Sequence, residues 1–185
     1  MDNGASCYLR FLDGDDRGLV ELIRAYKDGL ILFLHQFTGD YHTAEDLMED
    51  TFVKLAIRKP GFSGRSTFKT WLYSIARNTA MDHLRRHRRV RVVSQEELKE
   101  CESEGEDLER HVLRQERKVQ LHRSLEALKP EYRQVLHLTF FEGFSNAEAA
   151  VIMGRSRRQI ENLIYRAKHS LRSRLEKEGF TYEEL

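Results

Sequence analysis

The 185-residue sequence contains little of what disulfide-bonded, metal-binding or membrane-spanning proteins use. Its two cysteines, Cys7 and Cys101, lie far apart and lack metal-binding spacing, so we expect reduced thiols. The longest apolar stretch, residues 30–34, is too short to cross a membrane. No basic-then-apolar signal pattern opens the chain. These absences predict a soluble cytoplasmic protein without membrane insertion.

Signatures of catalysis are also missing. The sequence has no glycine-rich phosphate loop and no pairing of a nucleophile with a base. His83 and His87 have the i, i+4 spacing of two zinc ligands, but they lack an HExxH arrangement. Their neighbours are cations, which oppose a divalent metal. We therefore expect no enzyme activity, no cofactor and no metal site.

Charge is divided into blocks, although the formal net charge is only +1. Residues 77–91 contain six arginines and one aspartate, a net charge of +5. Residues 94–110 carry eight acidic and two basic residues, a net −6, and residues 155–177 carry eight basic and two acidic residues, a net +6. Two basic blocks therefore flank an acidic block, and the small net charge does not argue against a polyanionic partner.

Apolar residues recur at helical spacing along most of the chain. A first stripe covers residues 19–37. Thr43 is predicted to cap a second helix over residues 44–58. Ser66 is predicted to cap a long third helix that ends near Arg89.

The third predicted helix is apolar at its start and basic at its end. Its predicted buried side consists of Phe68, Trp71, Leu72, Ile75 and Thr79. Trp71 is interpreted as core, whereas Phe62 and Tyr73 could either pack in the core or offer a ring to an unstacked base. A rigidly packed first half would allow the helix to present a polar face to a ligand, formed by Asn78, Asp82, Arg85 and Arg89.

Two capping boxes lie close together near the C-terminal end. Ser145 and Glu148 form the first, and Ser156 and Gln159 form the second. Gly154 separates the two short helices that these boxes start. Two helices joined by so short a glycine-containing turn are typical of a helix-turn-helix.

All predicted elements are helices, and no useful stretch has the period of a strand. We predict an all-α protein of two small helical domains, residues 1–92 and 113–185, joined by an acidic linker at 93–112. The linker is too polar to offset its ordering entropy by burial, so a flexible segment or marginal helix is expected. Before the helix-turn-helix, Pro130 is predicted to open a helix with the apolar positions Tyr132, Val135, Leu136 and Phe140.

The last predicted helix has the residues of a recognition helix. Its outward residues Arg158, Glu161 and Asn162 suit base edges in a major groove. Cations on its flanks suit phosphates, namely Arg155, Arg157, Arg166 and Lys168. The alternative is an amphipathic helix with a merely basic surface.

A third feature is acidic. Asp46, Glu49 and Asp50 share one side of the second predicted helix, with Lys54 nearby. Three carboxylates on one face suit a solvated surface, a metal site or a docking surface for a basic partner. Without a matching ligand elsewhere, the metal site is the weakest of these alternatives.

Two segments resemble a known family. The segment AEDLMEDTFVKLAIRKPGFSGRSTFKTWLYSIARNTAMDHLRRHRR resembles conserved region 2 of the bacterial sigma-70 class, in its short extracytoplasmic-function (ECF) form. The segment LKPEYRQVLHLTFFEGFSNAEAAVIMGRSRRQIENLIYRAKHSLRSRL resembles region 4 of the same family. The order of the segments, the linker and the overall length also agree.

The resemblance implies three sets of binding residues. Docking on the β′ clamp helices of core RNA polymerase is implied for Asp46, Leu47, Glu49, Asp50 and Phe52, and the β flap of the polymerase is a further implied partner. Capture of the melted −10 element is implied for Phe62, Ser63, Gly64, Arg65, Ser66, Arg77, Asn78, Asp82, Arg85, Arg86, Arg88 and Arg89. Reading of the −35 element as duplex is implied for Arg155, Ser156, Arg157, Arg158, Gln159, Glu161, Asn162, Arg166 and Lys168.

The implied function is promoter-specific transcription initiation, in which the polymerase supplies the chemistry. An anti-sigma protein is a further implied partner. Glu161 stands where the family often has a cation, which points to a different base preference because carboxylates accept from cytosine amino groups. We also hypothesise that residues 96–109 mimic nucleic acid inside the polymerase. The alternative function is a helix-turn-helix regulator that acts without polymerase, but it would have no use for the pattern in residues 44–78.

Overall fold

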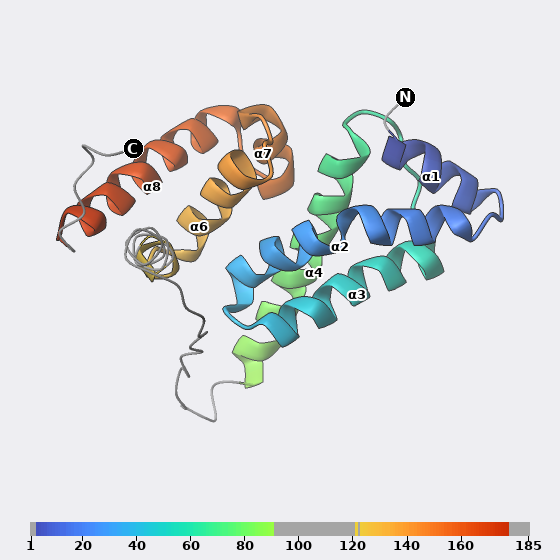
Figure 1. The fold of residues 1–185 in the computed structure, drawn as a ribbon, viewed down its shortest axis with the longest axis horizontal. Coiled ribbons are helices and arrows are strands. Elements are labelled where there is room, and N and C mark those ends of the chain that lie inside the picture. The colour runs from blue at the N-terminus through green and yellow to red at the C-terminus, as the bar shows by residue number, and fades with distance from the viewer. Residues whose placement is uncertain (1–2, 91–120, 122, 178–185) are drawn as a thin grey trace, which may run out of the picture.

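The computed structural model describes residues 3–90, 121 and 123–177, and every regular element in them is a helix (Figure 1). The predicted all-α fold is confirmed. The predicted acidic linker at residues 93–112 lies outside the described residues. We refer below to residues 3–90 as the N-terminal unit and to residues 123–177 as the C-terminal unit.

Four helices build the N-terminal unit: α1 (Asn3–Leu12), α2 (Arg17–Thr38), α3 (Tyr41–Arg58) and α4 (Phe68–Val90). The long helices α2 and α3 lie side by side, and α4 packs against both (Figure 1). The core between them is filled by large side chains that are almost completely buried: Tyr8, Leu30, Phe33, Leu55, Phe68 and Leu72. Burial of such apolar area is the main force that holds the four helices together.

Helix starts in this unit differ from the predicted ones by a few residues. Asp40, not Thr43, caps α3, because its carboxylate accepts a 2.8 Å hydrogen bond from the Thr43 amide and a 2.6 Å bond from the Thr43 hydroxyl. At the start of α4 the hydroxyl of Thr67, not of Ser66, accepts a 3.1 Å bond from the Thr70 amide. In both places a side-chain oxygen other than the expected one satisfies the orphan amide, three residues earlier at α3 and one residue later at α4.

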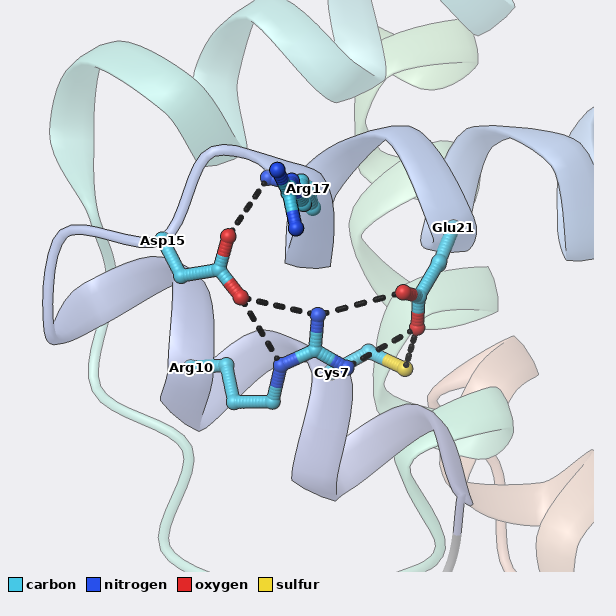
Figure 2. Close-up of polar contacts among 5 residues, drawn as sticks. All are labelled: Cys7, Arg10, Asp15, Arg17 and Glu21. Carbon is cyan, nitrogen blue, oxygen red and sulfur yellow. Dashed lines mark hydrogen bonds and ion pairs between the residues drawn. The ribbon is translucent and has the colours of Figure 1, made fainter.

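Helix α1 was absent from the sequence prediction, and a polar cluster fixes it to α2. The Arg10 guanidinium bridges Asp15 at 2.8 Å and Glu21 at 3.1 Å, and the Arg17 amide donates to Asp15 (Figure 2). The Cys7 thiol donates to Glu21 at 3.1 Å. Burial, followed by this hydrogen bond, raises the pKa of Cys7, so the thiol stays protonated.

The C-terminal unit contains α6 (Pro130–Leu136), the π-helical η2 (His137–Phe141), α7 (Asn146–Met153) and α8 (Arg157–Lys177). Both predicted capping boxes are present. Ser145 and Glu148 exchange bonds of 3.0 and 3.3 Å, and Ser156 and Gln159 exchange bonds of 2.8 and 3.2 Å. Gly154 ends α7 in the left-handed conformation, at φ 62°. The predicted helix-turn-helix is therefore confirmed as α7–turn–α8.

One predicted core residue of this unit is exposed. Phe140 follows the helical apolar period of residues 132–136, yet 57% of its surface is accessible. The cause is η2, because a π-helical turn holds more residues than an α-helical turn and shifts the following side chains around the axis. Leu138 is fully buried in its place, and Phe140 instead lies under the Lys168 ammonium at 4.7 Å.

The two units pack against each other, chiefly through α4 with α7 and α2 with α6 (Figure 1). Tyr73 is only 1% exposed and meets Phe144 edge to face at 5.0 Å, while Phe33 stacks on His137 at 6.2 Å. Gly29 allows this approach, since a Cβ there would lie 2.9 Å from Glu142 Oε1 of the C-terminal unit, as well as 2.5 Å from the Tyr73 hydroxyl. The alternatives for Tyr73 are thereby decided: its ring belongs to the core.

Polar contacts complete this unit contact. Lys69 Nζ donates to the Glu142 carbonyl at 2.9 Å and pairs with the Glu142 carboxylate at 2.8 Å. Thr70 donates to the Glu148 carboxylate at 3.1 Å. On the other side of the contact, Arg133 donates to the Gln36 carbonyl, at the C-terminal end of α2, at 3.2 Å. The contact thus combines aromatic packing with hydrogen bonds between the units.

Candidate polymerase and nucleic-acid interfaces

The acidic side of α3 is an exposed surface. Asp46, Glu49 and Asp50 are all exposed, in keeping with their predicted place on one helix face. Leu47 and Phe52, which belong to the same predicted set, are 2% and 5% exposed and pack in the core. Leu47 and Phe52 hold α3 on the core of the N-terminal unit. Of the predicted set, only the three carboxylates are therefore exposed to a partner.

Two apolar side chains that the sequence analysis missed lie on the same side of α3. Val53 is 50% exposed and Ile57 is 78% exposed. They follow Glu49 at i+4 and i+8, so they continue the carboxylate face toward the end of the helix. Their i, i+4 spacing outside the buried stripe is the sequence signal that could have revealed them. We call Asp46, Glu49, Asp50, Val53 and Ile57 the α3 face.

The predicted −10 loop is anchored at one end and open at the other. Phe62 is half-buried, and its ring packs against Phe68 at 5.7 Å and Trp71 at 5.3 Å. The Tyr8 hydroxyl holds the preceding chain by donating to the Pro60 carbonyl at 2.7 Å. Ser63, Gly64 and Arg65 are exposed, while Ser66 is half-buried. The aromatic cluster of Phe62, Phe68 and Trp71 therefore holds one end of a short, exposed polar loop in place.

The predicted −10 residues on α4 are arranged on more than one side of the helix. Asn78 is exposed, and so are Arg85 and Arg86. Asp82 is half-buried and pairs with Arg85, which is the main reason that its pKa lies below the ordinary value. The side chains of Arg88 and Arg89 lie outside the described residues.

Arg77 departs from this exposed group. It is half-buried and faces the C-terminal unit, where burial and then the nearby Arg155 lower its pKa. Arg155 belongs to the predicted −35 set. The structure thus brings one cation of each predicted DNA-binding set close together, while Asn78 lies on a different side of α4.

All nine predicted −35 residues are exposed. Two lie in the turn before the recognition helix α8, Arg155 and Ser156, and seven lie on α8 itself: Arg157, Arg158, Gln159, Glu161, Asn162, Arg166 and Lys168. Some of them already have partners. Arg155 pairs with Glu131 at 2.6 Å, and Arg157 pairs with Glu161 at 2.9 Å. Tyr165, 73% exposed, lies among them. Ile160, Leu163 and Ala167 are buried and fix the orientation of the helix.

His83 and His87 lie one turn apart on α4, with their ring centroids 4.2 Å apart and the rings tilted by 38°. Among the residues that the structure describes, no group of three or more His, Cys, Asp or Glu side chains is placed to hold a metal ion. Burial lowers the pKa of His83, which favours its neutral form. None of the described helices is long and apolar enough to span a membrane.

Comparisons with known proteins agree with this geometry. The family model for sigma-70 region 2 matches residues 22–90, and the model for sigma-70 region 4 matches residues 118–171. The first match covers the α3 face and the −10 candidates, and the second covers the helix-turn-helix. A chain with both regions, in this order and all helical, is of the class of bacterial transcription initiation factors.

Curated relatives place the chain more narrowly. It is 31% identical to the RNA polymerase sigma-H factor of Pseudomonas aeruginosa over 166 residues, which cover 85% of this chain and 86% of that protein. It is also 31% identical to the ECF RNA polymerase sigma factor SigC of Mycobacterium tuberculosis over 172 residues, covering 91% and 89%. The chain belongs to the sigma-70 family of RNA polymerase sigma factors, in its ECF subfamily.

Two solved structures share the fold. The first is CnrH in complex with the cytosolic domain of CnrY, with a TM-score of 0.67 and 23% identity, covering 95% of this chain and 99% of that one. The second is the sigma factor RpoE of Bartonella quintana in complex with the anti-sigma factor NepR, with a TM-score of 0.66 and 24% identity, covering 84% and 95%.

Proposed function

We propose that this sigma factor brings core RNA polymerase to its promoters through three separate surfaces. The α3 face binds the polymerase, the loop at residues 62–66 and the exposed side of α4 capture the melted −10 strand, and α8 reads the −35 duplex. The observation that carries the proposal is the α3 face, where three exposed carboxylates adjoin two exposed apolar side chains. A regulator that needs only DNA has no use for such a surface.

The α3 face suits a basic protein partner with an apolar ridge. Exposed Val53 and Ile57 supply apolar area that becomes buried on docking, and the carboxylates around them select a partner of opposite charge. The clamp helices of the β′ subunit are the partner that we assign to this face. Leu47 and Phe52 act indirectly, by holding the helix on the core.

Strand capture requires a base to leave the stack, which costs a few kcal/mol. The loop Ser63–Gly64–Arg65 and the half-buried Phe62 ring supply polar groups and an aromatic wall for that base. Asn78 supplies an amide for its hydrogen-bonding edge. Arg85 and Arg86 attract the phosphates of the following nucleotides. The proposal assigns the same role to Arg88 and Arg89.

Duplex reading is assigned to the N-terminal part of α8. Arg158, Glu161 and Asn162 are exposed within its first two turns and have the donors and acceptors that base edges require. Because Arg157 pairs with Glu161, we expect Glu161 to orient this guanidinium as well as to accept from cytosine. Arg155, Arg166 and Lys168 contact phosphate.

The protein performs no chemistry of its own in this scheme, because the polymerase forms the phosphodiester bonds. It acts in the cytoplasm, where promoters and polymerase are found. The β flap of polymerase is a second contact, made by the C-terminal unit. An anti-sigma protein is a further proposed partner, supported by the fold shared with RpoE of Bartonella quintana, which was solved with an anti-sigma factor.

Purified protein mixed with bacterial core polymerase tests this function directly. Complex formation and run-off transcription from a promoter pool are measured for the wild type, Asp46→Arg and Asn78→Ala. We expect Asp46→Arg to lose polymerase binding and Asn78→Ala to bind polymerase but open promoters poorly. Wild-type protein that binds duplex DNA and ignores core polymerase would instead be a regulator that acts alone.

A further inference from the structure

The seam between α3 and α4 contains a contact that the proposed roles do not use. Lys54 follows Asp46 and Asp50 along one side of α3, at i+8 and i+4. Its side chain reaches across to α4, where Nζ donates a 2.8 Å hydrogen bond to Thr79 Oγ1. The contact is partly buried and joins residues 25 positions apart in the sequence.

The acceptor of this bond is held firmly in place. Thr79 is 3% exposed, and its own hydroxyl donates to the Ile75 carbonyl at 3.0 Å. Thr79 directly follows Asn78, the exposed amide assigned to the melted strand. One turn further on, Asp82 feels the Lys54 charge in addition to that of Arg85. Lys54 therefore links the helix that carries the α3 carboxylates to the part of α4 that carries Asn78 and Asp82.

The same seam continues toward the start of α3. Asp50 and Asp46 act electrostatically on His83 of α4, opposing the burial and the cations that lower its pKa. Positions 54, 50 and 46 thus run antiparallel to positions 79 and 83. The α3 face and the strand-reading side of α4 share one border, and Lys54 is the residue that bonds across it.

The orientation of α4 about its axis sets the direction in which its strand-reading residues face. Consecutive residues of an α-helix lie about 100° apart around the axis, so Asn78 and Asp82 turn together with Thr79. Ala76 and Ala80, the buried apolar residues on either side of Thr79 in the sequence of α4, have the shortest apolar side chains, and the charge-assisted bond from Lys54 adds a directed contact beside them.

We propose that Lys54 is a positioning residue for strand capture: by bonding Thr79 across the seam, it fixes the direction in which Asn78 and Asp82 face while α3 is docked on polymerase. Lys54 touches neither polymerase nor DNA in this assignment. The assignment rests on the proposed function, and it adds a residue outside the three binding sets.

The test compares Lys54→Met, Thr79→Val, their double variant and Lys54→Arg in holoenzyme with core polymerase. Two affinities are measured, one for core polymerase and one of the holoenzyme for a single-stranded oligonucleotide carrying the −10 sequence of a promoter recovered from the pool. Each single variant should keep core affinity within about twofold and lose about tenfold in oligonucleotide affinity, the effect of one charge-assisted hydrogen bond. The double variant should lose no more than either single one, and Lys54→Arg should recover most of the affinity.

Thr51→Val is the matched control for a merely structural effect. Thr51 is fully buried on α3, and its hydroxyl donates at 2.7 Å to the Leu47 carbonyl within the same helix rather than to α4. It should lower the melting temperature at least as much as Thr79→Val and leave oligonucleotide affinity unchanged. An equal loss of oligonucleotide affinity in Thr51→Val overturns the proposal.

Three other results would also overturn it. A large loss of core affinity in Lys54→Met alone makes Lys54 a polymerase contact. If the losses of oligonucleotide affinity in the two single variants multiply in the double variant, Lys54 and Thr79 act separately. A direct contact of Lys54 with DNA would give that result. Unchanged oligonucleotide affinity in both single variants removes the positioning role. Wild-type protein that fails to bind core polymerase refutes the proposed function itself, a result distinct from all of these.

Discussion

Replacing Glu142 by glutamine should separate the two units of the free protein. Glu142 is at the centre of the unit contact, with a side chain that is 13% exposed and paired with Lys69 at 2.8 Å. Burial alone would raise its pKa, but the interactions with His137, Lys69 and Tyr73 outweigh burial and bring the pKa to about 2. Glutamine keeps the size of the side chain and removes its charge.

The size of the effect follows from that pKa. A fall from the ordinary 4.5 to about 2 corresponds to about 3 kcal/mol in favour of the charged, closed form. His137 belongs to the same unit as Glu142, so only the part due to Lys69 and Tyr73, on the order of 1–2 kcal/mol, stabilises the contact between units. A loss of that size shifts an open–closed equilibrium roughly tenfold toward the open form.

The same reasoning fixes the sign of the pH dependence. The pKa of Glu142 is lowered in the closed form, so its contribution is fully present above about pH 4.5 and is lost as the pH falls toward about 2. Acidification through this range should open the wild-type contact. Between pH 5 and 8 Glu142 should cause no change, which excludes it as a sensor near neutral pH.

Small-angle scattering and amide hydrogen exchange measure this opening. Glu142→Gln should increase the radius of gyration and speed exchange in α4 near Thr70 and in α7. Glu131→Gln is the matched control, because it removes a carboxylate from an exposed ion pair with Arg155 inside the C-terminal unit. If Glu142→Gln leaves both observables as they are in the control, the energetic reasoning above is wrong.

Separation of the two units should change the rate at which the protein binds core polymerase and promoter. The −35 and −10 elements lie about 25 base pairs apart, about 85 Å at 3.4 Å per base pair. Helix α4, with 23 residues among the longest described, spans only about 35 Å. Units in direct contact cannot reach both elements, so Glu142→Gln should bind core polymerase and promoter faster than the wild type.

Three further predictions concern the C-terminal unit. Ser145→Ala removes the cap of α7 and should destabilise the unit by about 1 kcal/mol in urea unfolding followed by circular dichroism; an unchanged midpoint would contradict the capping role. Gly154→Ala forces a side chain into the left-handed conformation at φ 62° and should cost about 1 kcal/mol in the same assay, whereas a gain would mean that the turn relaxes. Arg158→Ala should weaken binding to a −35 duplex by about 1–3 kcal/mol and relax selection at one base pair in a randomised duplex library; uniform weakening across all sequences would identify Arg158 as a phosphate contact instead.

Local signals explain what could be predicted from sequence. The capping boxes at Ser145 and Ser156 involve residues three apart, so their side chains and amides meet wherever a helix starts. The α3 carboxylates were predictable for the same reason, since residues at i, i+3 and i+4 share a face. The helix start at Asp40 was missed because Asp40 and Thr43 both carry a side-chain oxygen that can cap a helix, and the extended backbone at Asp40 selects the earlier residue.

Features that depend on tertiary structure could not be predicted. The periodic pattern placed Phe140 in the core because it assumes an α-helix, and the π-helix at His137–Phe141 changes the period. Leu47 and Phe52 were assigned to a docking surface by resemblance, while their burial follows from packing against other helices. Lys69 and Glu142 are 73 residues apart, and no local pattern connects them.

The position of Glu148 also limits how this chain can change over evolutionary time. One carboxylate oxygen closes the capping box with Ser145, and the other accepts from Thr70 of the opposite unit. Glutamine has the same length, but its single carbonyl oxygen accepts from the Ser145 amide only, so its amide nitrogen has to donate to the Thr70 hydroxyl and the direction of that bond is reversed. An aspartate side chain is too short to reach both Ser145 and Thr70, and alanine has no polar atom to bond to either residue. A substitution at this site is therefore selected twice, once for the start of a DNA-reading motif and once for its attachment to the rest of the molecule.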